Sequence, residues 1–403
     1  MELGTRSLED VVMFGDLYAD RRVFVTGHTG FKGSWLTLWL LDLGADVTGY
    51  ALGPPTQPNM FEAVGIGIAE VGRAAAAGRF TDLRGDVRER RALRRALDMA
   101  APEIVFHLAA QPLVRRSYAE PYLTYETNVM GTVNLLEEVR ALARTGRGPR
   151  VVVNVTSDKC YENAETGHAH AEGDTLGGFD PYSSSKGCSE LVTAAYRRSF
   201  FTEPAMPRVA TARAGNVVGG GDWGEDRMMP DCARALSAGV PIGVRNPGAI
   251  RPWQHVLESL SGYLWLGANL WRGAVDGGGE AAAFEGAWNF GPGADCNVTV
   301  REVVDLFITA WGGGEWRPVP RAADQPHEAS HLVLDVGKAE RKLGWRATWS
   351  VIDAVGAAAH WYADFHRGAD PAALRARCRA DIASYCDLAI RSGAVWATSG
   401  SPT

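Results

Sequence analysis

Short apolar runs alternate with longer amphipathic segments through the first half of the chain. Residues 22–26, 46–51, 103–109, 151–155 and 208–214 are mostly apolar and rich in β-branched or aromatic side chains. Between them, residues 33–43, 127–140 and 183–200 have the apolar spacing of helices. Strands that are apolar on both faces and separated by helices are typical of a parallel sheet covered on both sides. The pattern predicts an α/β, Rossmann-like, doubly wound fold.

The second half of the chain has a different character. After about residue 219 the strand patterns become irregular, and residues 241–254 contain three Pro and two Arg. We expect a surface extension (residues 1–20), a Rossmann domain (21–218), a smaller C-terminal α/β lobe (219–365) and a helical tail (366–403). Some elements of the smaller lobe can return to the first domain.

A glycine-rich loop follows the first predicted strand directly and leads into a predicted helix. Its GxxGxxG spacing allows a tight turn and lets backbone N–H groups approach a pyrophosphate at the helix N-terminus. A glycine loop alone can also be an ordinary turn, but its place between strand and helix favours a dinucleotide site. The residues expected to contact the dinucleotide are Gly27, Thr29, Gly30, Phe31, Lys32 and Gly33.

The adenosine end of this site is less well defined by the sequence. No carboxylate ends the second strand, where an acid often holds the ribose about 20 residues after the loop; that strand ends near Tyr50. Asp86, followed by Val87, could accept from the adenine amine, although a turn or helix N-cap is an equal alternative. Lys32 and the arginines near Arg84 could contact a 2′-phosphate or could be solvated. The prediction is NAD, with NADP left open.

Tyr182 and Lys186 stand four residues apart at the start of a predicted helix, so both project from one face. A nearby ammonium stabilises a phenolate and lowers the pKa of tyrosine from about 10. Such a phenolate can take a proton from a sugar hydroxyl while a hydride leaves the same carbon. The pair occurs by chance in many helices, but downstream of a glycine loop it predicts a catalytic site.

A second polar group stands at the C-terminal end of the predicted strand 151–155. Ser157, Asp158 and Lys159 follow that strand, and ligands of open α/β sheets bind beyond such strand ends. A strand cap or a loop ion pair is the alternative. We expect a hydroxyl that binds the reacting oxygen, with an acid and an amine for proton transfer.

Together the motifs resemble those of extended short-chain dehydrogenase/reductases that act on nucleotide sugars. The segments GHTGFKG (27–33), TSDKCY (156–161), RAGNVVGGGDW (213–223) and RPWQHVL (251–257) are similar to the family of CDP-glucose 4,6-dehydratases. The resemblance extends from about residue 21 to residues 334–345 and 360–365. Related dTDP- and GDP-sugar dehydratases typically carry Thr-Asp-Glu or Thr-Ser-Glu in place of Ser157-Asp158-Lys159, and 4-epimerases lack such a pair.

The resemblance implies an NAD-dependent hydro-lyase that converts CDP-glucose to CDP-4-keto-6-deoxyglucose without net redox change. Tyr182 would deprotonate the 4-hydroxyl, helped by Ser157 and by Lys186, which also binds the nicotinamide ribose. Asp158 would protonate the departing 6-hydroxyl and Lys159 would remove the C5 hydrogen; this division of roles is a hypothesis. Another NDP-hexose 4,6-dehydratase or a nucleotide-sugar 4-epimerase is the alternative. A non-catalytic NAD(P) sensor usually lacks the Tyr or the Lys.

The resemblance also assigns residues outside the catalytic group. Asn128 matches an asparagine that kinks a helix and positions the catalytic lysine through water. The expected cofactor loop is Leu108, Ala109, Ala110 and Gln111. Arginines suit a diphosphate, although solvated arginines and core tryptophans are the ordinary alternatives. The expected substrate residues are Asn216, Trp223, Arg245, Arg251, Trp253 and His255.

Composition narrows the class of protein further. The 403 residues carry 41 Lys and Arg against 47 Asp and Glu, a net charge of −6, which argues against a general nucleic-acid binder. No apolar run reaches the roughly 20 residues of a membrane span, and the acidic N-terminus does not fit a signal peptide. Six dispersed Cys suggest reduced thiols in the cytoplasm, and no metal site is expected, since His327 and His331 lack a third ligand. The family implies a homodimer formed through residues 127–140 and 183–199.

Overall fold

A seven-stranded parallel sheet forms the centre of the computed structural model, which describes residues 13–66, 79–276, 283–320 and 332–398. The strand order is β12-β7-β5-β4-β1-β2-β3, and every neighbouring pair is parallel. The strands are β1 (Arg22–Thr26), β2 (Asp46–Ala51), β3 (Phe80–Arg84), β4 (Ile104–His107), β5 (Val151–Val155), β7 (Arg208–Ala214) and β12 (Gly286–Phe290). The predicted α/β, doubly wound fold is confirmed.

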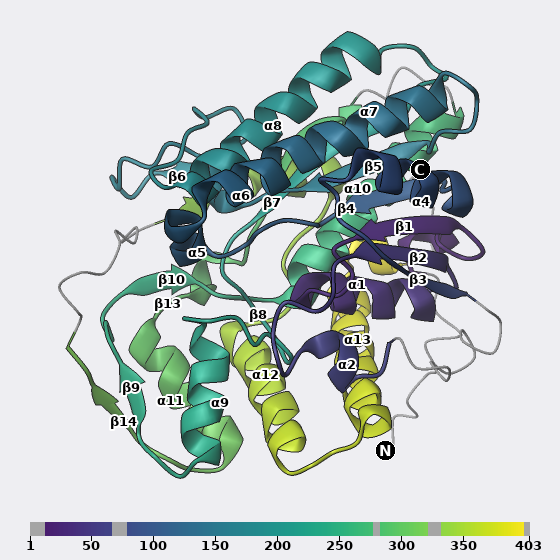
Figure 1. Cartoon of the computed structure of the whole chain (residues 1–403). Coiled ribbons are helices and arrows are strands. Elements are labelled where there is room, and N and C mark those ends of the chain that lie inside the picture. Colours follow the sequence, from purple (N-terminus) through teal and green to yellow (C-terminus); the bar gives the residue numbers. More distant parts are fainter. Residues whose placement is uncertain (1–12, 67–78, 277–282, 321–331, 399–403) are drawn as a thin grey trace.

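Helices cover both faces of the sheet because its strands are apolar on both sides. In β1, Val23 and Val25 face a core that contains Trp35, whereas Phe24 faces a second core that contains Leu93. The first core is formed by α1 (Phe31–Asp42), α10 (Val256–Asp276), α12 (Val351–His366) and α13 (Pro371–Arg391), and the second by α4 (Arg90–Ala100), α7 (Gly131–Ala143) and α8 (Pro181–Phe200). Figure 1 shows α7 and α8 side by side on one side of the sheet and α13 on the other.

The smaller lobe lies beyond the C-terminal ends of the central strands. It contains α9 (Met228–Ser237), α11 (Val300–Trp311) and the paired strands β9 (Ile242–Val244) with β14 (Trp316–Pro318) and β10 (Ile250–Pro252) with β13 (Asn297–Thr299). Between these segments the chain returns to the sheet as α10 and β12, and β12 pairs with β7. The lobe is therefore interrupted in sequence (Figure 1).

Both ends of the described chain pack into the core. Phe14 is buried and stacks on Trp396 with ring centroids 5.2 Å apart, and the buried Tyr18 donates to the carbonyl of Leu264. The expectation of a surface extension is wrong for residues 13–18, because their aromatic side chains fill the space beside α1 and α13; residues 1–12 lie outside the described part. The predicted C-terminal helix is present as α13.

The remaining elements are short. A π-helical turn, Glu126–Met130, separates α6 (Pro121–Tyr125) from α7 within the predicted helix 127–140. The others are α2 (Met60–Ala63), α5 (Val114–Ala119), β6 (Ala169–His170), β8 (Val217–Val218), β11 (Gln254–His255), β15 (Val333–Leu334) and the turns Phe14–Asp16, Asp158–Cys160, Ala294–Cys296, Ala339–Leu343 and Val395–Ala397. In the described part of the chain, no helix combines the length and the apolar character that crossing a membrane requires.

Candidate active site

The glycine loop packs tightly between β1, β4 and the start of α1. Gly27 has a φ of +76°, and a Cβ there would lie 2.8 Å from the backbone nitrogen of Ala109. A Cβ at Gly33 would collide with the carbonyl of Gly27. The N-terminus of α1 is thus left open beside a backbone turn, as a pyrophosphate requires. The residues present fit a dinucleotide.

Hydrogen bonds hold the loop that we expect to line the cofactor. The backbone N–H groups of Leu108 and Ala109 each donate to Thr26 Oγ1 at 3.1 Å. Asn128, in the π-helical turn, accepts from the Gln111 backbone at 2.8 Å and donates to Ser185 Oγ at 2.8 Å. The asparagine therefore ties the cofactor loop to α8, close to the predicted catalytic pair; its proposed link to the lysine through water is not tested.

Five other predicted cofactor residues contribute in different ways. Thr29 is buried and its hydroxyl donates to the carbonyl of Leu52. Tyr50 stacks on Phe24 in the core, so its ring is directed away from the loop, and its carbonyl accepts from the N–H of Gly27. Val87 is also buried in this core. Ala110 and Phe31 are half-buried beside the loop.

Asp86 is held by a neighbouring arginine. Its carboxylate accepts from the backbone and the guanidinium of Arg88, which also pairs with Glu126. Helix α4 begins at Arg90 with Glu89 as its N-cap, so the helix N-cap alternative for Asp86 is wrong. The turn alternative is confirmed, because the Asp86 carbonyl accepts from the N–H of Glu89. A role at the adenine remains a prediction.

Lys32 lies at the catalytic end of the site rather than at the adenosine ribose. Its Nζ donates to the hydroxyl of Tyr263 in α10 at 3.2 Å. Burial lowers the pKa of Lys32 to about 7, and the charge of Lys186 acts in the same direction. The suggested contact with a 2′-phosphate is therefore wrong for this residue. Arg84, the other candidate for that contact, pairs with Asp82 at 2.7 Å.

The polar residues after β5 form a compact turn. Ser157 donates to Asp158 Oδ1 at 2.9 Å and accepts from the backbone of Lys159 at 3.2 Å. Ser157 and Asp158 are buried, whereas Lys159 is half-buried, and its ammonium makes no hydrogen bond or ion pair with the described residues. A Cβ at Gly215 would collide with the Asp158 carboxylate, so only glycine fits opposite it.

Tyr182 and Lys186 are both buried in the first turns of α8. Pro181 is the first residue of this helix, and Asp180 caps it by accepting from the Ser183 backbone. Burial raises the pKa of Tyr182 to about 12, and a hydrogen bond with Ser157 opposes this rise only in part. The expectation that the pKa of the phenol is lowered is wrong for the chain by itself, because burial and the charges of Asp158 and Asp180 outweigh the Ser157 hydrogen bond and the charge of Arg227.

Lys186 lies beside backbone and acidic partners. Its Nζ donates to the carbonyl of Val155 at 3.3 Å. Burial lowers the pKa of Lys186 to about 8, and the charge of Glu190 opposes that shift. The ammonium is thus held at the end of β5, from which the turn with Ser157 departs.

A buried ionic network supports this turn and was not predicted from the sequence. Glu190 accepts from Thr156, from Thr211 at 2.7 Å and from Arg213 at 2.8 Å. Arg213 also donates to the hydroxyl of Tyr161 at 2.6 Å. The available signal was the position of Glu190, four residues after Lys186 on the same helix.

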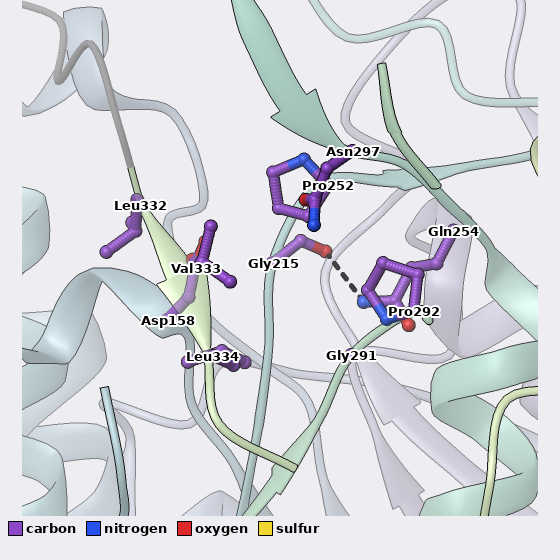
Figure 2. A pocket seen from close by; sticks show the side chains of 10 residues that line it. All are labelled: Asp158, Gly215, Pro252, Gln254, Gly291, Pro292, Asn297, Leu332, Val333 and Leu334. Carbon is purple, nitrogen blue, oxygen red and sulfur yellow. Dashed lines mark hydrogen bonds between the residues drawn. The ribbon is translucent and has the colours of Figure 1, made fainter. Parts of the chain in front are cut away.

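A small pocket opens at the C-terminal edge of the sheet, with Asp158 in its wall (Figure 2). Gly215 and Gly291, which also line it, directly follow β7 and β12. Gln254 donates to the carbonyl of Gly215 at 3.3 Å, as the dashed line in Figure 2 shows. The buried oxygens Gln254 Oε1 and Asn297 Oδ1 have no hydrogen-bond partner among the described residues. Neither residue was among the site residues predicted from the sequence.

Three predicted substrate residues instead lie in the protein core. Trp223 packs against Tyr362 and Phe365 of α12, with ring centroids 5.1 and 5.0 Å away. His255 is fully buried against the rings of Trp35 and Trp349, and burial lowers its pKa to about 3. Trp253 is buried and donates to the carbonyl of Val298. Because apolar neighbours cover these rings, the structure does not indicate that they contact a sugar directly.

The predicted phosphate-binding arginines lie near other charges. Arg245 pairs with Asp226 at 2.8 Å, and Arg115 pairs with the same carboxylate at 3.0 Å. Arg251 is in β10, and the carbonyl of Asn216 accepts from the Gln254 backbone. Arg115 and Arg227 were not predicted from the sequence; the charge of Arg227 acts on both Lys32 and Tyr182.

Comparison with known proteins places this geometry in a family. The family model described as GDP-mannose 4,6 dehydratase matches residues 24–356. The chain belongs to this family. The match includes the glycine loop, the turn after β5, the Tyr182 and Lys186 pair and β12.

Individual relatives agree with this assignment. A CDP-glucose 4,6-dehydratase of Salmonella typhimurium (strain LT2) is 45% identical over 364 residues, covering 88% of this chain and 94% of that protein. A UDP-glucose 4-epimerase of Oryza sativa subsp. japonica is 27% identical and covers 83% of this chain and 88% of its own length. The dTDP-glucose 4,6-dehydratase of Streptomyces venezuelae, solved with NAD bound, is 26% identical with a TM-score of 0.66, covering 84% of this chain and 96% of that one.

Proposed function

We propose that the protein is an NAD-dependent hydro-lyase that converts CDP-glucose to CDP-4-keto-6-deoxyglucose. The observation that carries the proposal is the juxtaposition of Tyr182 and Lys186 on α8 with Ser157, Asp158 and Lys159 after β5. The 45% identity to a CDP-glucose 4,6-dehydratase over 88% of the chain supports this choice of substrate.

Tyr182 and Ser157 serve the first half of the reaction. The Tyr182 phenolate takes the proton of the 4-hydroxyl, while Ser157 hydrogen-bonds the same oxygen. NAD, held by the glycine loop and by Lys186, would supply a hydride acceptor for C4 and a hydride donor for C6. Because burial raises the pKa of Tyr182 to about 12, the phenolate depends on cations nearby, and Arg227 supplies one of the opposing charges.

Asp158 and Lys159 serve the elimination. A ketone at C4 acidifies the hydrogen at C5, and neutral Lys159 can remove that hydrogen as a proton. Protonated Asp158 gives its proton to the departing 6-hydroxyl, which leaves as water. Asp158 and Lys159 directly follow Ser157 in the turn, and Asp158 lines the pocket of Figure 2.

The walls of the pocket offer contacts to the rest of the substrate. The unpartnered oxygens of Gln254 and Asn297 suit sugar hydroxyl donors, because buried acceptors need a hydrogen bond. Arg115, Arg245 and Arg251 come from neighbouring elements of the smaller lobe and α5 and suit a diphosphate. Asn216 precedes β8 on the same side of the sheet.

Product mass tests the proposal. The protein is incubated with CDP-, dTDP-, GDP- and UDP-glucose, each with NAD or NADP, and the products are weighed by mass spectrometry. We expect CDP-glucose with NAD to lose one water most rapidly. Fastest water loss from dTDP-, GDP- or UDP-glucose would identify a dehydratase for a different nucleotide sugar. A product of unchanged mass would identify a 4-epimerase, the activity named for one relative.

We also infer a homodimer formed by α6, α7 and α8. Tyr122 and Leu191, on α6 and α8, expose 79% and 56% of their surfaces. Met130, in the π-helical turn between α6 and α7, and Phe200, at the end of α8, are also exposed. Light scattering during gel filtration should give the mass of two chains, and Leu191→Glu should give the mass of one. The six unpaired cysteines agree with a cytoplasmic, reducing environment.

A further inference from the structure

Two histidines and one carboxylate converge on the segment that follows the catalytic turn. His168, His170 and Asp174 each present one ligand atom, and these atoms lie within 4.8 Å of one another. Asp174 Oδ2 is 2.7 Å from His168 Nε2 and 3.5 Å from His170 Nδ1. Atoms that share one Zn²⁺ at about 2.0–2.2 Å are roughly 3.4 Å apart in a tetrahedral site. Small side-chain movements would therefore bring all three onto one ion.

The second observation is a buried ring nitrogen that makes no hydrogen bond with the described residues. His170 is 6% exposed, and its Nδ1 has no hydrogen-bond partner among the described residues. The ring is nevertheless held in place, because it stacks on Tyr161 with centroids 4.9 Å apart and planes 12° apart. Its backbone carbonyl accepts from Asn289 Nδ2 at 2.8 Å. This nitrogen thus faces the Asp174 carboxylate, 3.5 Å away, from a fixed position, as a ligand prepared for an ion does.

We propose that His168, His170 and Asp174 bind a divalent transition-metal ion of the Zn²⁺ type. Two imidazoles and one carboxylate suit zinc or a neighbouring metal, whereas Mg²⁺ and Ca²⁺ prefer oxygen ligands. His168 is exposed and gives the ion access from solvent, and water completes the coordination. The expectation of no metal site rested on Cys patterns and on His327 and His331, which lie outside the described residues.

The proposed ion would brace one wall of the active-site pocket without touching the substrate. His170 ends β6, which pairs with β15 so that His170 is opposite Leu334 and Ala169 is opposite Val333. Leu334 and Val333 line the pocket that contains Asp158 (Figure 2). An ion on His170 would therefore stabilise the position of β15 beside the pocket.

Zinc titration of the whole protein tests the site. Tag-free protein is stripped with a chelator, dialysed and titrated with Zn²⁺ by calorimetry, and bound metal is counted by elemental mass spectrometry. We expect one Zn²⁺ per chain and a higher melting temperature with zinc. His168→Ala and Asp174→Asn should each weaken binding by at least about 100-fold and abolish the thermal shift.

Two features keep this test decisive. His360→Ala removes another exposed histidine, on α12, and should bind zinc as the wild type does. His168 is exposed, and Asn at position 174 keeps the shape of the side chain, so circular dichroism should show both variants folded. Wild-type protein that binds no stoichiometric zinc would overturn the proposal, as would equal zinc binding by wild type, His168→Ala and Asp174→Asn. A loss of zinc in His360→Ala with retention in His168→Ala would overturn it as well.

Discussion

Glu190 and Arg213 form an ion pair that is almost completely buried beneath the catalytic turn. Arg213 Nη2 lies 2.8 Å from Glu190 Oε2, and each side chain exposes only 3% of its surface. The same glutamate holds Thr156, which precedes Ser157, and the same arginine holds Tyr161 at the other end of the turn. The pair therefore fixes both ends of the segment that carries Asp158 and Lys159.

Removing one charge of this pair should destabilise the protein strongly. In Glu190→Gln the Arg213 guanidinium stays buried without a counter-charge, and we expect the free energy of unfolding to fall by about 3–5 kcal/mol. Urea unfolding at neutral pH measures the change. Glu190→Gln/Arg213→Met, which removes both charges, should recover part of the loss. A Glu190→Gln variant as stable as the wild type would show that the pair does not support the turn.

Lys32 should make stability depend on pH in a defined direction. Its pKa is lowered from 10.5 to about 7 by burial, so between these values the unfolded chain binds more protons, and the stability contributed by Lys32 rises with pH. Below about pH 7, Lys32 is charged in both the folded and the unfolded protein, so the folded protein carries the full free-energy cost of burying that charge. Lys32→Met should therefore be more stable than the wild type by about 1–2 kcal/mol near pH 6, with the difference vanishing toward pH 10. A pH-independent difference would place the ammonium in solvent.

Lys159 is expected to act as the base at C5. Its ammonium makes no hydrogen bond or ion pair with the described residues, which leaves it available to a substrate. In D₂O, wild-type protein should place solvent deuterium at C5 of the product, and Lys159→Met should slow that exchange by at least about 100-fold. Lys342→Met, in the turn Ala339–Leu343, is a matched lysine control. Unchanged exchange in Lys159→Met would mean that another group removes the C5 hydrogen.

Gln254 is expected to bind the sugar through its unpartnered oxygen. Gln254→Leu keeps the approximate volume but removes that acceptor and the donor to Gly215. The KM for CDP-glucose should rise by about tenfold, with a smaller change in kcat, since one hydrogen bond is worth about 1–2 kcal/mol. Steady-state kinetics at saturating NAD give both values. A fall in kcat with unchanged KM would indicate a role in positioning Asp158 instead.

Much of the central sheet could be predicted from local pattern alone. The bounds of β2 and β7 were predicted correctly because both strands are short apolar runs between polar turns. The prediction for β4 was too long mainly at its C-terminal end, because the backbone of Leu108 and Ala109 turns to donate to Thr26 Oγ1. The return of β12 to the sheet beside β7 could only be left open, because pairing between distant segments leaves no local signal.

The site was predictable where chemistry requires a fixed spacing along the chain. Tyr182 and Lys186 are one helical turn apart, and Ser157, Asp158 and Lys159 are consecutive, so a motif can reveal them. Trp223 and His255 stand in similar motifs, yet their rings are covered by aromatic neighbours, which sequence order does not encode. Asn297 enters the pocket from β13, and only tertiary contact connects it with Asp158.

The central claim is a dehydration in which one hydride leaves C4 and returns to C6 of the same molecule. Its most direct test uses CDP-glucose carrying deuterium at C4, with NAD and no other redox partner, and locates the label in the product by NMR. We predict a product lighter by one water with the deuterium at C6. A product that keeps its oxygen atoms and its deuterium at C4, or deuterium retained on NAD, would contradict the account.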